Sequence, residues 1–461
     1  MSDHLPRITP AQRRARLGRR HLLAPSARAA RVEAVADAVV GLHATDPATV
    51  YLSACARLRE PGAGEVERAL YEDVSLVKLL SMRRTIFAVT TELAPVVGSS
   101  TARAIAVRER ATLLKHLRER AEEHWDEARL AEVEKAVLAA VAERGEATTA
   151  EVAEDVPALR ERIVMAPGKP YAARQTVGSR LLRLLASDGH LRRCRPRGSW
   201  TSSLYPWALV PPLPDLPVRE AKAELARRWL AAYGPATEAD LKWWTGWTVT
   251  DTRRALADIG AQGVTLAEGP GYVVPGDVPG DAEPLTDGGP LAGGEPVADG
   301  EPVADGEPLA GGEPAAGREP AADGEPLAGE SPVADRSPAA GESPVAGRSP
   351  LADDEPWAAL LPGLDPTAMG WQARGWYLDP DHVKPLFDGS GNIGPTVWWN
   401  GRIVGGWAQR ANGEVVWRAL TDVGREATAA VAAEAARLSG WLGEVRVTPR
   451  FRTPLERDLA S

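Results

Sequence analysis

Three polar side chains with chemical potential lie close together in a short break between two apolar segments. His43, Thr45 and Asp46 supply an imidazole, a hydroxyl and a carboxylate within four positions. A neutral imidazole can orient or deprotonate a water molecule, and a carboxylate can stabilise positive charge that develops on a substrate. The break, with the sequence HATDP, is therefore a candidate site for hydrolysis.

The same break also fits a purely structural interpretation. Asp46 followed by Pro47 is typical of a helix start, with the carboxylate as N-cap and proline at the first helical position. His43 follows Gly41 at the end of a helix predicted over residues 29–42, where an imidazole can interact with the helix dipole. The residues alone leave the structural and the chemical interpretation open.

Arginines gather in two further places. Four fall within a predicted β-hairpin between His190 and Trp200, and three lie on a basic amphipathic helix predicted over residues 174–187. Most charge runs form solvated faces. An arginine-dense hairpin beside a basic helix is, however, the arrangement with which winged-helix folds contact phosphates. Two more lie between the apolar runs VSLVKLL and IFAVT, where they can bind phosphate or act as solvated gatekeepers beside an aggregation-prone strand. The candidate DNA-binding residues are Arg83, Arg84, Arg174, Arg180, Arg183, Arg192, Arg193, Arg195 and Arg197.

Helix and strand signals predict the elements that position these residues. Residues 126–217 and 218–275 each contain three predicted helices followed by two strands joined by a turn, the order of a winged helix. Residues 1–125 fit the same order more loosely. Their predicted helices lie near residues 10–23, 29–42 and 47–58. The sequence thus predicts an α+β protein with three tandem winged-helix motifs, followed by a small C-terminal β-rich domain.

The C-terminal domain is predicted over residues 357–461. Two Asn-Gly steps in TVWWNGRIVGGWAQRANGEVVWRAL favour consecutive antiparallel strands, and a helix over residues 424–438 and a last strand in EVRVTP follow. The motif GSGNIG has the glycine spacing of dinucleotide-binding turns. Because PTVWWN after it is strand-like and does not open a helix, we predict a turn without a nucleotide.

Residues 276–356 differ from the rest of the chain in composition. From Pro284 to Pro356 a proline recurs at every sixth position, in units such as GEPVAD and ESPVAG. A six-residue period suits a β-helix, but the positions after proline are mostly alanine, with some valine and leucine, and are flanked by Asp, Glu and Gly. Little apolar area is therefore available for burial, and a disordered acidic insertion is predicted. With 19 acidic residues and three arginines, the segment accounts for the net charge of −9 of the 461-residue chain. The other 51 Lys/Arg against 44 Asp/Glu make the folded part mildly basic, which permits an anionic partner.

Neither a metal nor a cofactor is expected. The seven histidines include no HxH or HExxH spacing, and the two cysteines lie far apart in the sequence. This cysteine usage predicts a reduced, cytoplasmic protein. The sequence contains no apolar run that fits a signal peptide or a membrane span, so no membrane partner is expected.

Several motifs resemble those of the winged-helix family that contains the AlkZ and YcaQ DNA glycosylases. The resemblance covers about residues 5–275 and 355–455, in the stretches GLHATDPATVYLSACARL, LLSMRRTIFAVT, LPGLDPTAMGWQARGWYLDP and LFDGSGNIGPTVWWNGRIVGGW. It implies three tandem winged helices with a concave, basic DNA-binding surface. It also implies base excision of bulky alkylated purines, including natural-product adducts, often as antibiotic self-resistance. The expected partner is double-stranded DNA, bound by a monomer that is nucleoid-associated in the complex.

The family's catalytic motif is Gln-x-Gln, or Gln-x-Asp in the YcaQ branch, and it lies in the first winged helix. At that place this sequence has His43-Ala44-Thr45, followed by Asp46. An N7-alkylated purine is a cationic leaving group, so the protein has to stabilise an oxocarbenium-like sugar and position a water molecule. Asp46 can stabilise the sugar, and His43, with Thr45 as its hydrogen-bond partner, can position the water molecule.

Two functions follow from the resemblance. Since no lysine accompanies the motif to form a Schiff base, the first is a monofunctional DNA glycosylase, a hydrolase of base excision repair. The alternative is a non-catalytic winged-helix DNA-binding protein, either a regulator or a lesion-binding factor, because the arginine-rich elements suit both functions.

Overall fold

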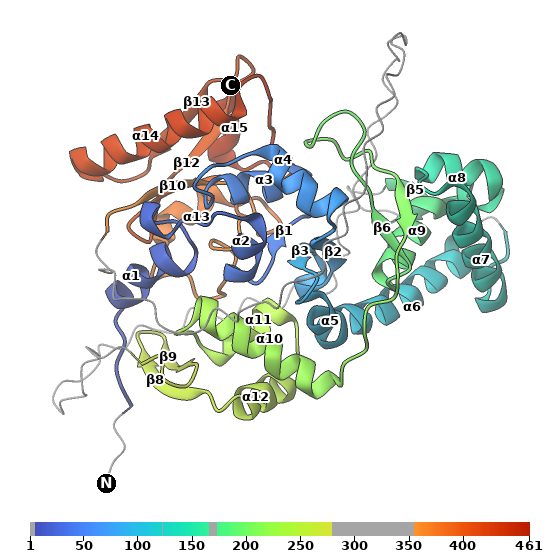
Figure 1. The fold of residues 1–461 in the computed structure, drawn as a ribbon, viewed down its shortest axis with the longest axis horizontal. Coiled ribbons are helices and arrows are strands. Elements are labelled where there is room, and N and C mark those ends of the chain that lie inside the picture. The colour runs from blue at the N-terminus through green and yellow to red at the C-terminus, as the bar shows by residue number, and fades with distance from the viewer. Residues whose placement is uncertain (1–4, 122, 166–172, 279–354) are drawn as a thin grey trace, which may run out of the picture.

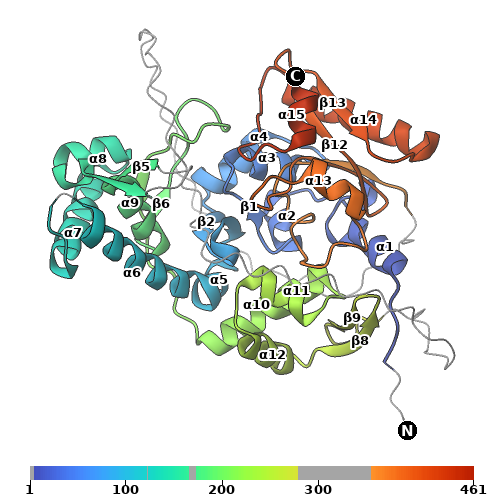
Figure 2. The same cartoon turned by 180° about the vertical axis from the view of Figure 1, so that it is seen from behind.

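The computed structural model describes residues 5–121, 123–165, 173–278 and 355–461 (Figure 1). Helices and antiparallel strands are mixed along the chain, so the predicted α+β class is confirmed. The acidic repeat, by contrast, lies almost wholly outside the described residues. In the two opposite views, the N-terminal part lies between the C-terminal domain on one side and the α7–β7 region on the other (Figures 1 and 2).

The N-terminal part surrounds a three-stranded antiparallel sheet with helices. Its strands, β1 (Leu42–His43), β2 (Leu76–Leu80) and β3 (Ile86–Thr90), pair in the order β1-β3-β2. The helices are α1 (Pro10–Arg20), α2 (Val32–Ala38), α3 (Pro47–Cys55), α4 (Ala63–Glu67), α5 (Ala94–Val97) and α6 (Arg103–Arg120).

The helix predicted over residues 29–42 is shorter than expected. Val40 and Gly41 have φ angles of 52° and 109°, and a Cβ atom at Gly41 would lie 2.9 Å from Cγ1 of Val89, so the chain turns where glycine alone fits. The next two residues pair with β3, His43 opposite Phe87. His43 is therefore a strand residue, and the prediction that it caps a helix is wrong.

Two runs of three helices and a hairpin follow. The first contains α7 (Glu127–Arg144), α8 (Thr149–Asp155), α9 (Val177–Ser187), β6 (Leu191–Arg193) and β7 (Trp207–Leu209). The second contains α10 (Val218–Tyr233), α11 (Glu238–Thr245), α12 (Val249–Asp258), β8 (Gln262–Leu266) and β9 (Gly269–Val273). Threonine N-caps at positions 148, 176, 237 and 248 accept backbone N–H groups and set the starts of four of these helices.

The first run differs from the prediction around its third helix. An additional hairpin of β4 (Arg162–Met165) and β5 (Ala173–Thr176) precedes α9. Arg174 therefore lies on a strand opposite Val164, and the prediction that it begins the helix is wrong, because Thr176 caps α9 at that point. The second strand of the later hairpin is also shorter than predicted, since Trp200 leaves the hairpin and stacks on Tyr51 at 4.7 Å.

The C-terminal domain is a four-stranded antiparallel sheet in the order β10-β11-β12-β13. Its elements are β10 (Ala358–Leu361), α13 (Val383–Leu386), β11 (Thr396–Trp399), β12 (Arg402–Gln409), β13 (Val415–Ala419), α14 (Gly424–Leu442) and α15 (Pro454–Ala460). Asn400-Gly401 joins β11 to β12, and the GSGNIG segment is a turn followed by a strand, as predicted.

The last strand expected in EVRVTP is absent from the described structure. The amide side chain of Gln409 takes the place of a backbone ladder, because it accepts from Val447 N at 2.8 Å and donates to Val445 O at 3.1 Å. These two hydrogen bonds pair backbone N–H and C=O groups of the segment, which therefore does not need a neighbouring strand.

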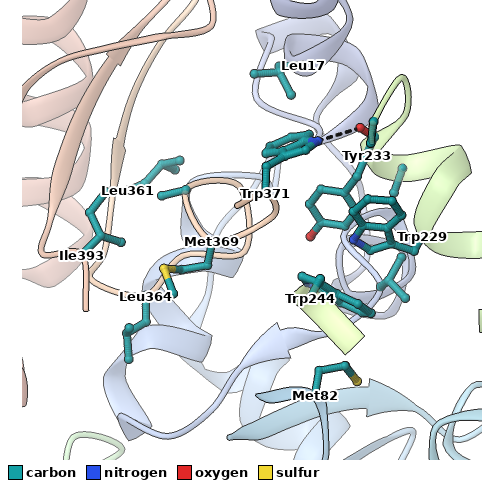
Figure 3. Packing of buried hydrophobic residues seen from close by; sticks show 14 of the residues in the cluster. Leu17, Met82, Trp229, Tyr233, Trp244, Leu361, Leu364, Met369, Trp371 and Ile393 are labelled. Carbon is teal, nitrogen blue, oxygen red and sulfur yellow. Dashed lines mark hydrogen bonds between the residues drawn. The ribbon is translucent and has the colours of Figure 1, made fainter. Parts of the chain in front are cut away.

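A buried aromatic core joins the N-terminal part, the α10–α12 run and the C-terminal domain (Figure 3). Rings of Trp229, Tyr233, Trp244 and Trp371 pack with centroids between 5.1 and 6.2 Å apart. Trp371 Nε1 also donates to the backbone oxygen of Tyr233 at 3.0 Å. Because large buried aromatic side chains contribute strongly to packing, this core fixes the three parts relative to one another.

Candidate functional site

His43 lies in a dry, aromatic setting at the end of β1. Its side chain is 4% exposed, and its ring lies edge-on to Phe87 with centroids 5.2 Å apart. Neither ring nitrogen hydrogen-bonds to a described residue, and Nδ1 is buried. Burial, and secondly the positive charge of Arg83, lower the pKa of the imidazole to about 3. At neutral pH His43 is therefore a neutral imidazole whose nitrogens form no hydrogen bond within the described ranges.

Thr45 ties the loop after β1 to the rest of the sheet. Its Oγ1 accepts a hydrogen bond from Ile86 N at 3.1 Å, and its backbone oxygen accepts from Arg450 Nη1 at 3.4 Å. Thr45 is thus not the hydrogen-bond partner of His43, and this part of the prediction is wrong because the hydroxyl holds β3 instead.

Asp46 is the N-cap of α3, as predicted. Its Oδ1 accepts from Ala48 N at 3.1 Å, and its Oδ2 accepts from Arg450 N at 2.9 Å. Burial raises the pKa of the carboxyl group, although both backbone N–H groups and the charge of Arg450 act against this. Asp46 also borders a shallow recess between α3 and the C-terminal domain, lined mainly by apolar side chains such as Leu52 and Trp407.

A buried ion pair that the sequence analysis did not identify anchors α3. Arg57 and Asp365 are fully buried, with Nη2 and Oδ1 2.7 Å apart. The remaining Arg57 donors bond to the Asp365 carboxylate, to two backbone oxygens and to Thr367 Oγ1, so all five are satisfied. Only such complete bonding makes a buried pair tolerable. The pair holds the helix that Asp46 caps, and the negative charge of Asp365 also acts on His43.

Arg83 and Arg84 occupy the turn between β2 and β3 in unusual backbone conformations. Their φ angles are 54° and 58°, in the left-handed region that costs energy for residues other than glycine. Arg84 is neutralised by Glu109, with Nε and Oε1 2.9 Å apart. Among the described residues Arg83 has no ion pair or hydrogen bond, and its guanidinium lies over Trp243, 4.0 Å from the ring centroid. The two neighbouring arginines therefore differ in their availability for an anion.

Most of the arginines predicted around β6 already have carboxylate partners. The closest nitrogen–oxygen distances of these ion pairs are 4.0 Å for Arg192–Glu146, 2.6 Å for Arg195–Glu72 and 2.7 Å for Arg197–Glu151. Phosphate binding by these three residues would have to replace an existing ion pair.

Arg183 and Arg193 form the centre of a positive cluster where α9 and β6 contact β2. Burial, helped by the charges of Arg180, Arg193 and Arg450, lowers the pKa of Arg183 to about 10. Arg193 lies over the ring of Tyr205, 5.0 Å from its centroid, and has no carboxylate partner among the described residues. The charge of Arg450, which hydrogen-bonds both Thr45 and Asp46, adds to the positive potential at Arg183, and the cluster favours an anionic ligand.

Lys78 of β2 borders this cluster. Its Nζ donates to Tyr71 Oη at 2.7 Å, and burial together with the charge of Arg193 lowers the pKa of the amine to about 7. Lys78 pairs with Ala88 of β3, whereas His43 pairs with Phe87, the residue before Ala88 on the same strand. Because successive strand residues point to opposite faces, Lys78 and His43 lie on opposite faces of the sheet.

Two further findings limit the chemistry within the described ranges. These residues contain no group of three or more His, Cys, Asp or Glu side chains that could hold a metal ion. No helix among them has the length and apolar character needed to cross a membrane.

Sequence reasoning missed the residues that long-range packing brings to the site. Arg450 lies about 400 positions from Asp46, and Arg374 and Trp243 meet Arg83 from two other parts of the fold. Arg374 and Asp365 lie within the motif LPGLDPTAMGWQARGWYLDP, which was the only available signal for them.

Comparisons with known proteins agree on one family. A family model described as DNA glycosylase AlkZ-like matches residues 6–288 and 318–441. Among solved structures the chain is similar to Streptomyces sahachiroi DNA glycosylase AlkZ, with 20% sequence identity, a TM-score of 0.60, and coverage of 96% of this chain and 99% of that chain. At this identity the likeness establishes the fold. No curated protein matches the sequence.

Proposed function

The chain belongs to the AlkZ-like DNA glycosylase family, and from this premise we propose that it is a monofunctional DNA glycosylase, a base-excision-repair hydrolase that binds duplex DNA. The proposed substrates are N7-alkylated purines, bulky natural-product adducts included, and the proposed biological role is antibiotic self-resistance. The observation that carries the proposal is the buried, neutral His43, whose ring nitrogens have no partner among the described residues, at the position of the family's catalytic motif.

In the proposed reaction, an N7-alkylated purine leaves as a neutral base without prior protonation, because alkylation has already made it cationic. A neutral imidazole at His43 orients the attacking water by accepting a hydrogen bond, and it takes the proton once the water oxygen has bonded to C1′ and become strongly acidic. The carboxylate of Asp46 stabilises the oxocarbenium-like sugar. Thr45 positions the loop through its bond to Ile86, so we assign it a supporting role.

The proposed DNA-binding surface is centred on arginines without carboxylate partners. Arg83, Arg183 and Arg193 meet this condition among the described residues, and Arg174 is exposed on β5. Arg180 joins the same positive cluster. The remaining predicted contacts require a phosphate to replace a carboxylate. These residues are Arg84, Arg192, Arg195 and Arg197.

The absence of lyase activity is proposed from the sheet geometry. Lys78 has a lowered amine pKa, which suits a Schiff-base nucleophile. It lies, however, on the opposite face of the sheet from His43. A sugar whose C1′ is next to His43 is therefore out of its reach.

We also propose that both runs of three helices and a hairpin are winged helices, and that residues 1–125 form a third. The proposed boundaries are 1–125, 126–217, 218–275 and 357–461, with residues 276–356 as an acidic insertion. We expect a cytoplasmic monomer that is nucleoid-associated on DNA. The support is the element order of each run and the family assignment.

The test is excision from duplex DNA that carries N7-methylguanine or a bulky natural-product adduct. The pure protein is incubated with the duplex, and abasic sites are scored by alkaline strand cleavage. We expect abasic product with the wild type and with the exposed control His124→Ala, and background levels with a His43→Ala, Asp46→Ala double variant. If the wild type binds the duplex but gives no more abasic product than the double variant, the enzyme proposal is wrong.

One observation favours a second candidate, a non-catalytic DNA-binding protein. The Thr45 hydroxyl and the Asp46 carboxylate are both used in backbone hydrogen bonds, which is enough to explain their presence. This candidate predicts duplex binding of unchanged affinity when His43 or Asp46 is replaced, with no abasic product from any variant.

A further inference from the structure

Two guanidinium groups from distant parts of the chain lie over one half-buried aromatic ring. Arg83, from the β2–β3 turn, and Arg374, from the loop before α13, have their guanidinium carbons 4.0 and 5.1 Å from the centroid of Trp243. All three side chains are half-buried and so retain contact with solvent. Three parts of the fold thus contribute to a single cluster, which the sequence motifs do not predict.

The cluster is held in place by the core in Figure 3. Met82 precedes Arg83 and is completely buried there, and Trp244 follows Trp243 and is 2% exposed. Arg374 lies between two buried tryptophans at positions 371 and 376. Arg83 and Trp243 each adjoin a core residue, and Arg374 lies within three positions of two, so the core constrains the backbone of all three members.

The cluster carries two positive charges and has no acidic partner among the described residues. Within the described part of the chain neither Arg83 nor Arg374 forms an ion pair, and Arg374 Nε is buried without a hydrogen bond. Burial, and secondly the charge of Arg374, lower the pKa of Arg83 to about 10. Stacking on Trp243 compensates only part of the cost of two like charges in a poorly hydrated place.

We propose that Arg83, Arg374 and Trp243 form a binding site for a phosphate group of the DNA backbone beside the reacting nucleotide. Guanidinium groups bind paired phosphate oxygens in bidentate geometry, and a phosphodiester supplies two such oxygens and one negative charge. The same two positive charges disfavour a cationic alkylated base. The ring of Phe87 lies 5.2 Å from that of His43 and 6.1 Å from that of Trp244, the residue after Trp243, so this ring series connects the cluster to the proposed water-activating residue.

This inference rests on the proposed function, and its test uses a duplex with a tetrahydrofuran abasic analogue that cannot be hydrolysed. Affinity is measured by fluorescence anisotropy for the wild type, Arg83→Met and Arg374→Met. Methionine keeps an unbranched apolar stem over Trp243 and removes the charge. The control is Arg219→Met, an exposed arginine that pairs with Asp258. Single neutral methylphosphonates are then moved along both strands.

We expect each cluster variant to bind the duplex about tenfold more weakly, with a salt-dependence slope lower by about one, and the control to be unchanged. One methylphosphonate near the analogue should weaken wild-type binding by a similar factor and leave the variants unaffected. The melting temperature of Arg83→Met should be unchanged or higher, since removing one of two like charges relieves repulsion. A merely structural role would lower it instead.

The inference is overturned if the cluster variants bind the duplex like the wild type. It is also overturned if every methylphosphonate that weakens binding by the wild type weakens binding by the variants equally. It is also overturned if inorganic phosphate raises the wild-type melting temperature through Arg83 and Arg374 while duplex binding does not depend on them, because the source of the anion is then free phosphate. Abasic-site formation measured in parallel separates these outcomes from failure of the proposed function.

Discussion

The neutral state of His43 makes the stability of the protein depend on pH in a defined window. The imidazole has a pKa of about 3 in the folded chain, against about 6.5 when unfolded. The unfolded chain binds a proton at His43 more readily than the folded chain does. The contribution of neutral His43 to the free energy of unfolding is therefore fully present above pH 6.5 and is lost as the pH falls toward 3. Each pH unit inside the window is worth about 1.4 kcal/mol, so going from pH 7 to pH 5 removes about 2 kcal/mol.

A second buried histidine adds to this dependence. Burial, and secondly the charge of Arg57, also lower the pKa of His21 to about 3. Together the two residues predict that the free energy of unfolding falls by about 4 kcal/mol from pH 7 to pH 5. Asp46, whose pKa is raised, contributes with the opposite sign at lower pH. Asp46 is present in the wild type and in the histidine variants described below, so its contribution cancels when their pH dependences are compared.

The assay is urea unfolding of the wild type, His43→Gln and the exposed control His124→Gln at pH 5, 6 and 7. We expect His43→Gln to lose about half of the wild-type pH dependence in this range and the control to keep all of it. If His43→Gln and the wild type have the same pH dependence, His43 is not held neutral, and the reasoning from its burial is refuted.

Three further predictions concern the surrounding residues. Asp365→Ala leaves Arg57 buried without its partner and should lower the free energy of unfolding by about 3–5 kcal/mol, measured by chemical denaturation; an unchanged midpoint would contradict this. Arg193→Ala should reduce the salt-dependence slope of duplex binding by about one, and Arg197→Ala, which has to leave its carboxylate to bind DNA, by less; equal effects would argue against the distinction. Borohydride should not trap the wild type on abasic DNA, and a covalent adduct that Lys78→Ala abolishes would disprove monofunctional chemistry.

Local signals predicted much of the fold because they act over a few residues. Threonine caps, glycine stops and Asn-Gly turns set several helix ends and hairpin turns, and Asp46 caps α3 as its sequence indicates. Errors arose where tertiary contacts override local preference. The sequence pattern of residues 29–42 predicts a helix throughout, but the close approach of Gly41 to Val89 ends it early. The pattern of EVRVTP predicts a strand, but its backbone hydrogen-bonds to a glutamine side chain instead.

The sequence could indicate candidate site residues but not their contacts. Sequence and family resemblance indicated His43 and Asp46, whereas the pairing of Thr45 with Ile86 depends on how β1 adds to the sheet. Likewise, the sequence cannot distinguish an arginine with a distant carboxylate from one without, so Arg83 and Arg84 looked equivalent. Only the packing of three parts of the chain on one core brings Arg374 to Arg83.

The most direct test of the central claim is the release of free base under single-turnover conditions. Liberated N7-methylguanine is quantified by mass spectrometry from a duplex with one such lesion, using the wild type and His43→Gln, with duplex affinity measured alongside. We expect base release by the wild type and a rate at least about 100-fold lower for His43→Gln at unchanged affinity. Equal rates for the two proteins, or bound duplex from which no base is released, would contradict it.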